Sequence, residues 1–226
     1  MRKQRPRGST TRQAVVEAAL AVVDDVGTEA FSLRAVARRV GVAPMSLYTH
    51  FANKDELLDL MYAEVARRLY ADAGHSTWQA EFVALCHQVR RVLLQHPRWT
   101  SLLSRPAPPL RVPLRERLLA LLTSDGVPVR EAFIAVSNAG LVSLGLTLVE
   151  LTLRDSEGKS SLETRFYRLK NQSERPSPNG EDPLTHKAVA ESDRFDLSDN
   201  FDAAIRAFIA GVAAGGASES AELRAV

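Results

Sequence analysis

Residues 32–54 constrain the fold of this chain more than any other segment, because their pattern predicts two short helices joined by a sharp turn. Ser32 stands at the position of an N-cap, and Gly41 supplies the conformational freedom that a tight corner needs. Between them, apolar residues recur at the i, i+3, i+4 and i+7 spacing of one buried helix face, and these are Leu33, Val36, Ala37 and Val40. The segment therefore predicts a first helix, a corner and then a second helix.

The second helix is predicted to keep a solvent-facing polar side. Pro44 suits its first turn, and Leu47 and Phe51 give it an inward side. The outward residues carry hydroxyl, ring and apolar groups of the size that meets base edges and phosphates in a DNA major groove, and they are Met45, Ser46, Tyr48, Thr49 and His50. A pair of antiparallel helices buried in a core is the alternative. The turn of about three or four residues favours a DNA-binding helix-turn-helix instead.

Positive charge is concentrated around this motif. Residues 1–54 hold nine Lys and Arg against four Asp and Glu, a net of +5, whereas the whole chain carries +2. A basic end on an otherwise slightly acidic chain indicates a polyanionic partner. Residues 1–9 include Arg5 and Arg7 and have no apolar run, so a disordered basic arm that contacts DNA is expected, with a solubilising tail as the alternative.

The composition is that of a soluble globular protein, with 45% hydrophobic and 25% charged residues. A single cysteine excludes an internal disulfide, and no secretory signal is recognisable, so a cytoplasmic location is expected. The sequence contains no His-Glu-x-x-His, no Gly-x-Ser-x-Gly, no phosphate-binding Gly-x-x-x-x-Gly-Lys and no Cys-x-x-Cys. Neither an enzyme nor a metal site is therefore expected.

Helical periodicity extends through most of the chain, so an all-α fold is expected. A first helix is predicted from Thr10, whose hydroxyl would form a capping box with Gln13, to Gly27. Asn53 and Glu56 have the same cap spacing and predict the start of a connector helix. Both helices would bury residues at helical spacing, namely Val15, Ala19, Val22, Val23 and Val26 in the first and Leu57, Leu58, Met61, Val65 and Leu69 in the connector.

The expected organisation is a three-helix helix-turn-helix head joined to a larger helical ligand-binding and dimerisation body. The boundaries are 1–9 for the arm, 10–54 for the head, 55–77 for the connector helix and turn, 78–214 for the body and 215–226 for a flexible tail. Within the body, residues 105–113 are proline-rich and predict a stiff extended connection. Residues 154–196 are polar and turn-rich and predict a partly mobile loop.

Two helices of the body carry most of its apolar residues. Residues 129–153 leave almost no polar face, which predicts burial on nearly all sides, and residues 198–214 have one apolar face. A transmembrane span is the alternative for the first helix, but polar and charged residues interrupt it too often, so no membrane partner is expected. The two helices could pair with their copies in a second chain, or each could close a monomeric core.

Four motifs of the head stand in a set order and spacing, and they are Leu33-Arg34-Ala35-Val36-Ala37, Gly41-Val42, Leu47-Tyr48-Thr49-His50-Phe51 and Asn53-Lys54-Asp55-Glu56-Leu57-Leu58. With them the head closely resembles the TetR family of bacterial transcriptional repressors. The body is similar to that of the tetracycline repressor at Trp78-Gln79, Ser104-Arg105-Pro106 and residues 137–145. The resemblance implies a homodimer that binds a near-palindromic operator in double-stranded DNA. A small-molecule inducer in each body would control the spacing of the heads and release the operator.

The motif also predicts roles for individual residues of the head. Phosphate contacts are expected from Arg34, Tyr48, His50 and Lys54, and base contacts from Pro44, Met45, Ser46 and Thr49. Two alternatives to the full description stay open: a DNA-binding regulator without a small-molecule ligand, and an activator.

A set of residues near the family's ligand contacts mixes apolar and polar side chains, and it comprises Tyr70, Cys86, Val89, Arg90, Ser101, Leu102, Arg105, Phe133, Ser137 and Leu141. It predicts a pocket, between the connector helix and the body, for a largely apolar molecule with a few hydrogen-bonding groups. In the tetracycline repressor, imidazoles and a glutamate help to hold a magnesium–drug chelate. Those positions fall near Tyr70, Ser101 and Val149, with Glu150 one residue away, and no imidazole stands at either histidine position. The inducer is thus unidentified, magnesium–tetracycline is not expected, and no cofactor is predicted.

Overall fold

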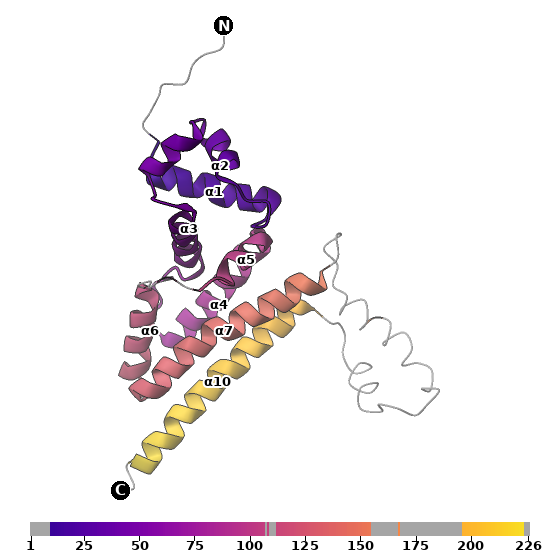
Figure 1. Cartoon of the computed structure of the whole chain (residues 1–226). Coiled ribbons are helices and arrows are strands. Elements are labelled where there is room, and N and C mark those ends of the chain that lie inside the picture. The colour runs from indigo at the N-terminus through magenta and orange to yellow at the C-terminus, as the bar shows by residue number, and fades with distance from the viewer. Residues whose placement is uncertain (1–9, 107, 109–111, 155–166, 168–195, 224–226) are drawn as a thin grey trace. The chain divides into compact units, whose positions relative to one another are not determined.

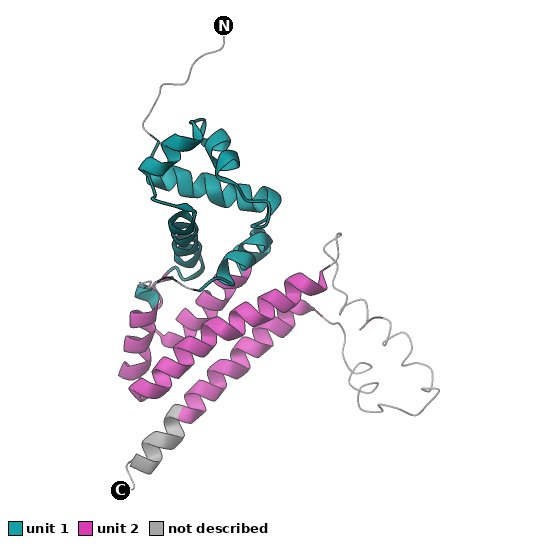
Figure 2. Ribbon diagram, in the orientation of Figure 1, with its two compact units in different colours: residues 1–71, 91–114 teal, residues 72–90, 115–226 magenta. Residues whose placement is uncertain are grey.

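The computed structural model describes residues 10–106, 108, 112–154, 167 and 196–223, whose regular structure is entirely helical (Figure 1). This confirms the all-α fold expected from the sequence. The chain divides into two compact units, coloured differently in Figure 2. Unit 1 comprises residues 1–71 and 91–114, and unit 2 comprises residues 72–90 and 115–226. The predicted arm at 1–9 and most of the predicted loop at 154–196 lie outside the described residues.

Unit 1 contains the predicted helix-turn-helix. Along the chain it is formed by α1 (Arg12–Val26), α2 (Leu33–Val40), the 3₁₀ helix η1 (Pro44–Thr49) and α3 (Lys54–Leu69). The unit also includes the end of α4 (Trp78–Gln95), the 3₁₀ helix η2 (Pro97–Trp99) and the short α5 (Thr100–Leu103). Its largest fully buried side chains include Leu20, Leu47, Leu57, Met61, Leu69, Leu93, Trp99 and Leu102. These residues form the core that positions the outward face of η1.

The ends of the helices in the motif are fixed by the residues that the sequence pattern indicates. Ser32 Oγ accepts a hydrogen bond from the backbone N–H of Ala35 at 3.3 Å, which caps α2. Gly41 follows α2 in the left-handed region, with φ of +84°. Asn53 Oδ1 accepts from the backbone N–H of Glu56 at 2.9 Å and caps α3. The predicted helix, corner and second helix are therefore confirmed.

The first helix departs from its prediction at both ends. The N-cap is Thr11 and not Thr10: Thr11 Oγ1 accepts from the backbone N–H three residues further on at 3.1 Å. Gln13 does not complete a capping box, because its Nε2 donates to Glu17 Oε1 at 2.9 Å. Val26, expected to face inward, is 48% exposed. Because Val26 lies on the same face as the buried residues of α1, its exposure means that the last turn extends past the helices covering that face.

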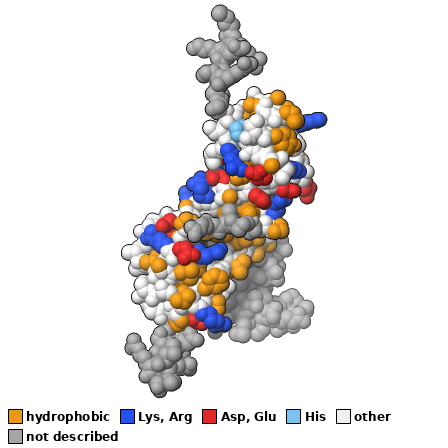
Figure 3. All heavy atoms as spheres, turned by 60° about the vertical axis from the view of Figure 1, so that its left-hand side comes forward, with side chains coloured by type: hydrophobic (Ala, Val, Ile, Leu, Met, Phe, Trp, Pro, Cys, Tyr) orange, Lys and Arg blue, Asp and Glu red, His pale blue; other side chains and the backbone are white. Residues whose placement is uncertain are grey.

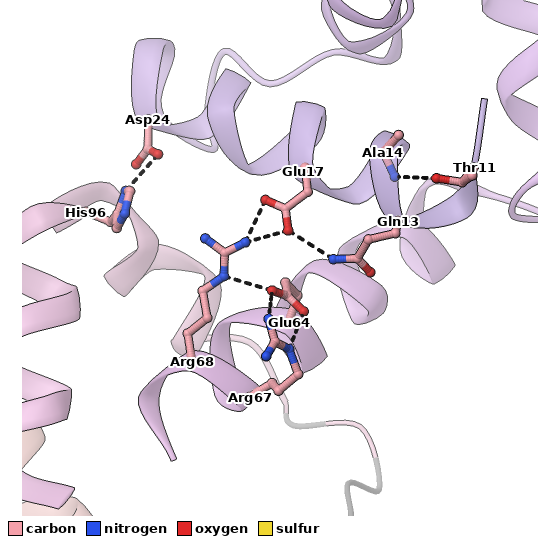
Figure 4. A network of polar contacts seen from close by, with 9 residues as sticks. All are labelled: Thr11, Gln13, Ala14, Glu17, Asp24, Glu64, Arg67, Arg68 and His96. Carbon is pink, nitrogen blue, oxygen red and sulfur yellow. Dashed lines mark hydrogen bonds and ion pairs between the residues drawn. The ribbon is translucent and has the colours of Figure 1, made fainter. Parts of the chain in front are cut away.

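A network of ion pairs joins α3 to α1 within unit 1 (Figure 4). Arg68 Nη2 donates to the two carboxylate oxygens of Glu17 at 2.5 and 2.6 Å, and Arg68 Nε donates to Glu64 at 2.8 Å. Arg67 donates two further hydrogen bonds to Glu64, at 2.6 and 2.8 Å. The hydrogen bonds from Arg67 have the largest effect on the pKa of Glu64. Together with the other interactions of Arg67 and Arg68, they lower it from 4.5 to about 2, although burial alone would raise it.

Replacing Glu64 with glutamine is expected to weaken the acid sensitivity of the fold. Because the pKa of Glu64 is lower in the folded state, its stabilising contribution is complete above about pH 4.5 and is lost as the pH falls toward about 2. The free energy of unfolding, measured by urea denaturation across this range, should therefore fall less steeply in Glu64→Gln than in the wild type. Glu29→Gln, which removes an exposed carboxylate from the same unit, is the control. Parallel curves for Glu64→Gln and the wild type would contradict the assignment.

Unit 2 is built from the first part of α4, most of α6 (Pro113–Ser124), α7 (Val129–Leu153) and α10 (Leu197–Leu223). α7 and α10 lie side by side (Figure 1). Cys86 of α4 packs against Phe201 and Ile205 of α10 in the core. Ser143 of α7 donates a hydrogen bond to the backbone oxygen of Cys86 at 3.1 Å. Burial raises the pKa of the Cys86 thiol to about 11, so this cysteine stays protonated and acts as a small core residue.

The last helix continues beyond its predicted end. The periodic apolar pattern predicts residues 198–214, whereas α10 runs from Leu197 to Leu223 and so includes most of the tail that was expected to be flexible. The pattern stops near Val212 because the residues that follow are small or polar. Ala and Glu are favourable inside helices even without an apolar face, which a search for periodicity does not detect.

α7 has the predicted bounds, but the prediction that it is buried on nearly all sides is wrong. Its buried residues are small or polar, and they are Ala132, Ala135, Ala139, Ser143, Thr147 and Glu150. Six of its large apolar residues are exposed by 36% to 70%, and they are Val129, Phe133, Ile134, Leu141, Leu148 and Val149. Others, such as Val142 and Leu146, are half-buried and pack against the core of unit 2. Small side chains let α7 pack closely on one side, which leaves several of the bulky ones on the other. In space-filling view, hydrophobic side chains are visible among the charged ones at the surface (Figure 3).

The exposed face of α7 also bears on the membrane alternative. Among the described helices, α7 alone is long and apolar enough to cross a membrane. Its length and composition are those of many core and interface helices as well. One side of α7 is occupied by the rest of unit 2, where Glu150 is 3% exposed and ion-paired. The exposed side is therefore the part of α7 that another molecule could cover.

Candidate nucleic-acid interface and ligand-binding residues

The 3₁₀ helix η1 presents exposed side chains of mixed chemistry. Leu47 is fully buried and anchors η1 in the core of unit 1. Around it, Met45 is 76% exposed and Tyr48 is 44% exposed. Thr49 Oγ1 donates to the backbone oxygen of Ser46 at 2.8 Å, so its hydroxyl proton is engaged while its oxygen can still accept a hydrogen bond. This face combines an apolar tip, a phenol ring and hydroxyl groups, as the sequence predicted.

Three exposed cations of the same unit have no ion-pair partner among the described residues. Arg34 and Arg38 stand one turn apart on α2, so their side chains share one side of that helix. Lys54 begins α3, and its Nζ lies 5.6 Å from the centroid of the Phe31 ring. These charges are available to a polyanion without breaking an ion pair. Arg38 was not among the predicted residues, although its i, i+4 spacing from Arg34 could have indicated it.

Other arginines of the head are engaged by carboxylates. Arg39 Nη1 lies 2.5 Å from Asp25 Oδ2, and Arg12 Nη2 lies 2.5 Å from Glu56 Oε1. Exposed ion pairs of this kind contribute little to stability, but they compensate positive charge locally. The net charge of the head, as counted from the sequence, therefore overstates the positive charge that is available to an anionic partner, because it counts paired and unpaired cations alike.

The structure places every described member of the predicted DNA-contacting set in unit 1, and these are Arg34, Pro44, Met45, Ser46, Tyr48, Thr49, His50 and Lys54. All of them are exposed except His50, which is half-buried. Arg5 and Arg7 of the same set lie outside the described residues.

The predicted ligand-binding set is divided between the two units. Tyr70, Ser101, Leu102 and Arg105 belong to unit 1. Leu102 is fully buried, and Ser101 Oγ donates to a backbone oxygen of η2 at 2.7 Å. Arg105 Nη2 lies 3.5 Å from Asp55 Oδ1 in the first turn of α3. The structure thus gives Arg105 a partner on the helix that begins with Lys54.

The other predicted ligand-binding residues lie in unit 2, in unlike surroundings. Cys86 and Val89 are buried in α4. Phe133, Ser137 and Leu141 are exposed, on the side of α7 that does not face the core of unit 2. Within unit 2, these two groups of residues therefore do not line the same wall of a pocket.

Arg90, also predicted to bind ligand, is held by a buried carboxylate. Arg90 Nε donates to Glu150 Oε2 at 2.7 Å and Arg90 Nη2 donates to Glu150 Oε1 at 3.0 Å, a bidentate geometry. Arg90 Nη1 donates to Ser198 Oγ at 3.1 Å, and its guanidinium lies 5.2 Å from the Phe201 ring centroid. Arg154 donates to the same carboxylate. Burial alone would raise the pKa of Glu150, but the hydrogen bonds from the two arginines outweigh it and lower that pKa.

A cavity of about 500 Å³ lies between the first half of α7 and the middle of α10. Its lining is mostly apolar, with Glu131 and Asn138 as polar members, and comprises Val127, Glu131, Ile134, Ala135, Asn138, Ala207, Phe208, Gly211, Val212 and Gly215. Added Cβ atoms at Gly211 and Gly215 would meet no atom within 4 Å. Sequence reasoning missed this cavity, although small residues recur every fourth position along α10.

Two family models match the chain. Residues 15–61 match the model described as bacterial regulatory proteins of the tetR family. Residues 71–215 match the model of the tetracycline-repressor-like C-terminal domain. The chain belongs to the TetR family. The TetR-family resemblance that the sequence motifs predicted is thereby confirmed for both head and body.

Curated relatives are TetR-family and other helix-turn-helix regulators. The transcriptional repressor DrrR1 of Streptomyces coeruleorubidus is 30% identical, over 72% of this chain and 62% of its own length. The tetracycline repressor protein class D of Escherichia coli is 26% identical, over 61% of this chain and 65% of its own length. The chain thus spans less than two thirds of either relative. Apo ActR from Streptomyces coelicolor shares the fold, with a TM-score of 0.72 at 23% identity over 94% of this chain and 99% of that chain.

Proposed function

We propose that this chain is a transcriptional repressor that binds a near-palindromic DNA operator as a homodimer and releases it when a small molecule binds. The observation that carries the proposal is the exposed face of η1, in the same unit as the unpaired cations of α2 and α3. In a helix-turn-helix, the second helix enters the major groove while neighbouring elements contact the backbone. Membership of a family of regulatory proteins supports this use of the motif.

The proposed DNA contacts follow the chemistry of the exposed side chains. Phosphate contacts are assigned to Arg34, Tyr48, His50 and Lys54, to which Arg38 is added, and base contacts to Pro44, Met45, Ser46 and Thr49. Met45 offers only apolar contact, which suits thymine methyl groups. Ser46 and Thr49 offer hydroxyl oxygens to donors on base edges.

Replacing Lys54 with alanine is expected to weaken binding to all DNA sequences alike. The side chain supplies charge and not base readout, so the slope of log affinity against log salt should decrease by about one unit. The measurement is fluorescence anisotropy, with a duplex that the wild type selects from a random library and with an unrelated duplex. Arg67→Ala is the control, because it also removes one exposed cation from unit 1, at a site paired with Glu64.

Two outcomes of this experiment would contradict the proposed interface. One is wild-type binding that does not respond to salt. The other is a Lys54→Ala variant with unchanged affinity and slope. Substitution of Ser46 or Thr49 should by contrast change the preferred sequence while the salt slope stays that of the wild type.

The exposed face of α7 supports the proposed homodimer. Large apolar side chains such as Phe133, Leu141 and Val149 are more than half exposed on a helix that packs beside α10. A second copy of the same helix pair would cover them and fill the cavity lined by Phe208 and Gly211. Exposed apolar surface of this kind marks interaction sites in soluble proteins. The two heads of the dimer would then each take one half of the operator.

An effector is proposed from the sequence of the predicted ligand-binding set, leaving out Phe133 and Leu141, which the proposed homodimer covers. Its mixture of apolar and polar side chains suits a largely apolar molecule with a few hydrogen-bonding groups. We assign Arg90 to holding unit 2 together, because Glu150 and Ser198 already engage its guanidinium. ActR, which shares the fold, has been crystallised with actinorhodin and with (S)-DNPA. Magnesium–tetracycline is not proposed, because the positions of the chelate's imidazole ligands fall at Tyr70 and Ser101, and neither residue is a histidine.

A thermal-shift screen separates this proposal from a regulator without a ligand. A molecule that binds the folded state raises the melting temperature by mass action. To act as an inducer, it must also bind more tightly to the dimer that misfits the operator. Compounds that raise the melting temperature would therefore be tested for release of the selected duplex. If no compound raises it, or none of those that do releases DNA, the ligand-responsive part is contradicted and DNA binding is not.

A further inference from the structure

The segment that follows α4 is fastened to the last turn of α1. His96 Nδ1 lies 2.8 Å from Asp24 Oδ2 (Figure 4). Arg98 Nη1 donates to the backbone oxygen of Asp24 at 2.8 Å and also to that of Asp25. The carbonyls of a last helical turn have no partner within the helix, and the negative end of the helix dipole lies there. Arg98 therefore caps α1 from another element of unit 1.

A second attachment joins the same segment to the middle of α1. The ring of Trp99 stacks on the imidazole of His96, with centroids 3.8 Å apart and planes at 6°. Arg68 lies over the Trp99 ring at 5.2 Å from its centroid and donates two hydrogen bonds to Glu17 of α1. Trp99 is 1% exposed, so this stack is a fixed part of the core. α1 is thus held to η2 both at its end and near its middle.

The same turn of α1 is linked to the helices that face DNA. Asp25, whose carbonyl accepts from Arg98, uses its carboxylate to bind Arg39 of α2. α2 in turn packs against α1 and against η1. A continuous series of contacts within unit 1 therefore runs from η2 through the last turn of α1 to α2 and η1. Arg98 is exposed and its contacts are polar, so losing them should leave the core of unit 1 intact.

We propose that His96 and Arg98 are positioning residues for operator binding, which set the orientation of the DNA-reading helices through the last turn of α1. This inference rests on the proposed function, because it concerns how two heads meet two half-sites. Neither residue touches DNA in this account. Their effect is on which separation of half-sites the homodimer accepts, and not on the contacts within one half-site.

The test is a series of duplexes that carry two copies of the wild-type half-site, separated by spacers that differ by one base pair. Arg98→Met is expected to lose about tenfold in affinity at the best wild-type spacing, which is the effect of losing one charge-assisted hydrogen bond. It is also expected to bind duplexes with neighbouring spacings with more similar affinities. Binding to a single half-site should not change. His96→Phe keeps the stack with Trp99, removes the contact with Asp24, and is expected to broaden the spacing profile in the same way.

Arg67→Met is the matched control, since it removes one cation from unit 1 without touching η2 or the end of α1. It should keep the wild-type spacing profile, and circular dichroism of each variant shows that it is folded. If the wild type has no preferred spacing, the proposed function fails. If the wild type has a preferred spacing, two results would overturn the positioning role. One is that Arg98→Met and His96→Phe keep the wild-type spacing profile. The other is that they lose as much affinity for a single half-site as for the two-site duplex.

Discussion

Replacement of Arg90 by methionine is expected to lower the free energy of unfolding by about 3 kcal/mol, because it leaves a buried carboxylate without its main partner. Glu150 is 3% exposed, and Arg90 supplies two of its hydrogen bonds. The same guanidinium also reaches Ser198 and the ring of Phe201. One substitution thus removes three hydrogen bonds that join α4 to α7 and to α10, while the methionine keeps most of the apolar volume.

The effect can be measured by urea denaturation and by the melting temperature. A loss of about 3 kcal/mol corresponds to a decrease of about 6–12 °C in a protein of this size. Arg154→Met is the control: Arg154 donates to the same carboxylate but is 38% exposed, so a loss of about 1 kcal/mol or less is expected.

The double variant Arg90→Met with Glu150→Gln distinguishes loss of the ion pair from loss of packing. It removes the charge that the single variant leaves unpaired, and should therefore regain much of the lost stability. An Arg90→Met variant as stable as Arg154→Met would contradict the structural role assigned to the pair. No restoration in the double variant would assign the loss to packing instead.

The helix-turn-helix could be predicted in detail because its determinants are local. Ser32, Gly41 and Asn53 act on backbone groups within a few residues, and the sequence contains both partners of each cap. The burial of Leu47 follows from periodicity in the same way. The error at Thr10 has the same origin: two adjacent threonines offer the same cap, and the sequence does not say which hydroxyl meets the amide.

The surroundings of the body residues could not be predicted, because they depend on contacts between distant segments. The apolar pattern of α7 identifies a helix with two non-polar sides, but not which side the rest of the chain covers. The small residues Ala132, Ala135 and Ala139 took the inner side. The ion pair between Arg90 and Glu150 joins residues sixty positions apart. The only partner of Glu150 that its local sequence offers is Arg154, four residues further on, and this spacing does not indicate the contact with Arg90. A polar residue within an apolar pattern is as typical of a ligand-binding site as of a structural ion pair, so the sequence did not distinguish these two roles for Arg90.

Replacement of Leu141 by glutamate is expected to convert the proposed homodimer into a monomer at micromolar concentration. Leu141 is 67% exposed, so the fold should tolerate the change, whereas a two-fold interface would bring in two buried charges, one from each chain. Sedimentation velocity measures the oligomeric state. Ala120→Glu is the matched control, because it adds the same charge at an exposed apolar position of α6 in the same unit.

Loss of the dimer should cause a large decrease in affinity for DNA that carries two half-sites. Two linked heads bind the second half-site as an intramolecular step, so the monomeric variant should lose about a hundredfold or more in affinity for the two-site duplex. Its affinity for a single half-site should equal that of the wild type, since η1 is untouched. A Leu141→Glu variant that stays dimeric would move the interface away from this side of α7. A monomer with wild-type affinity for the two-site duplex would show instead that the operator is read without a homodimer.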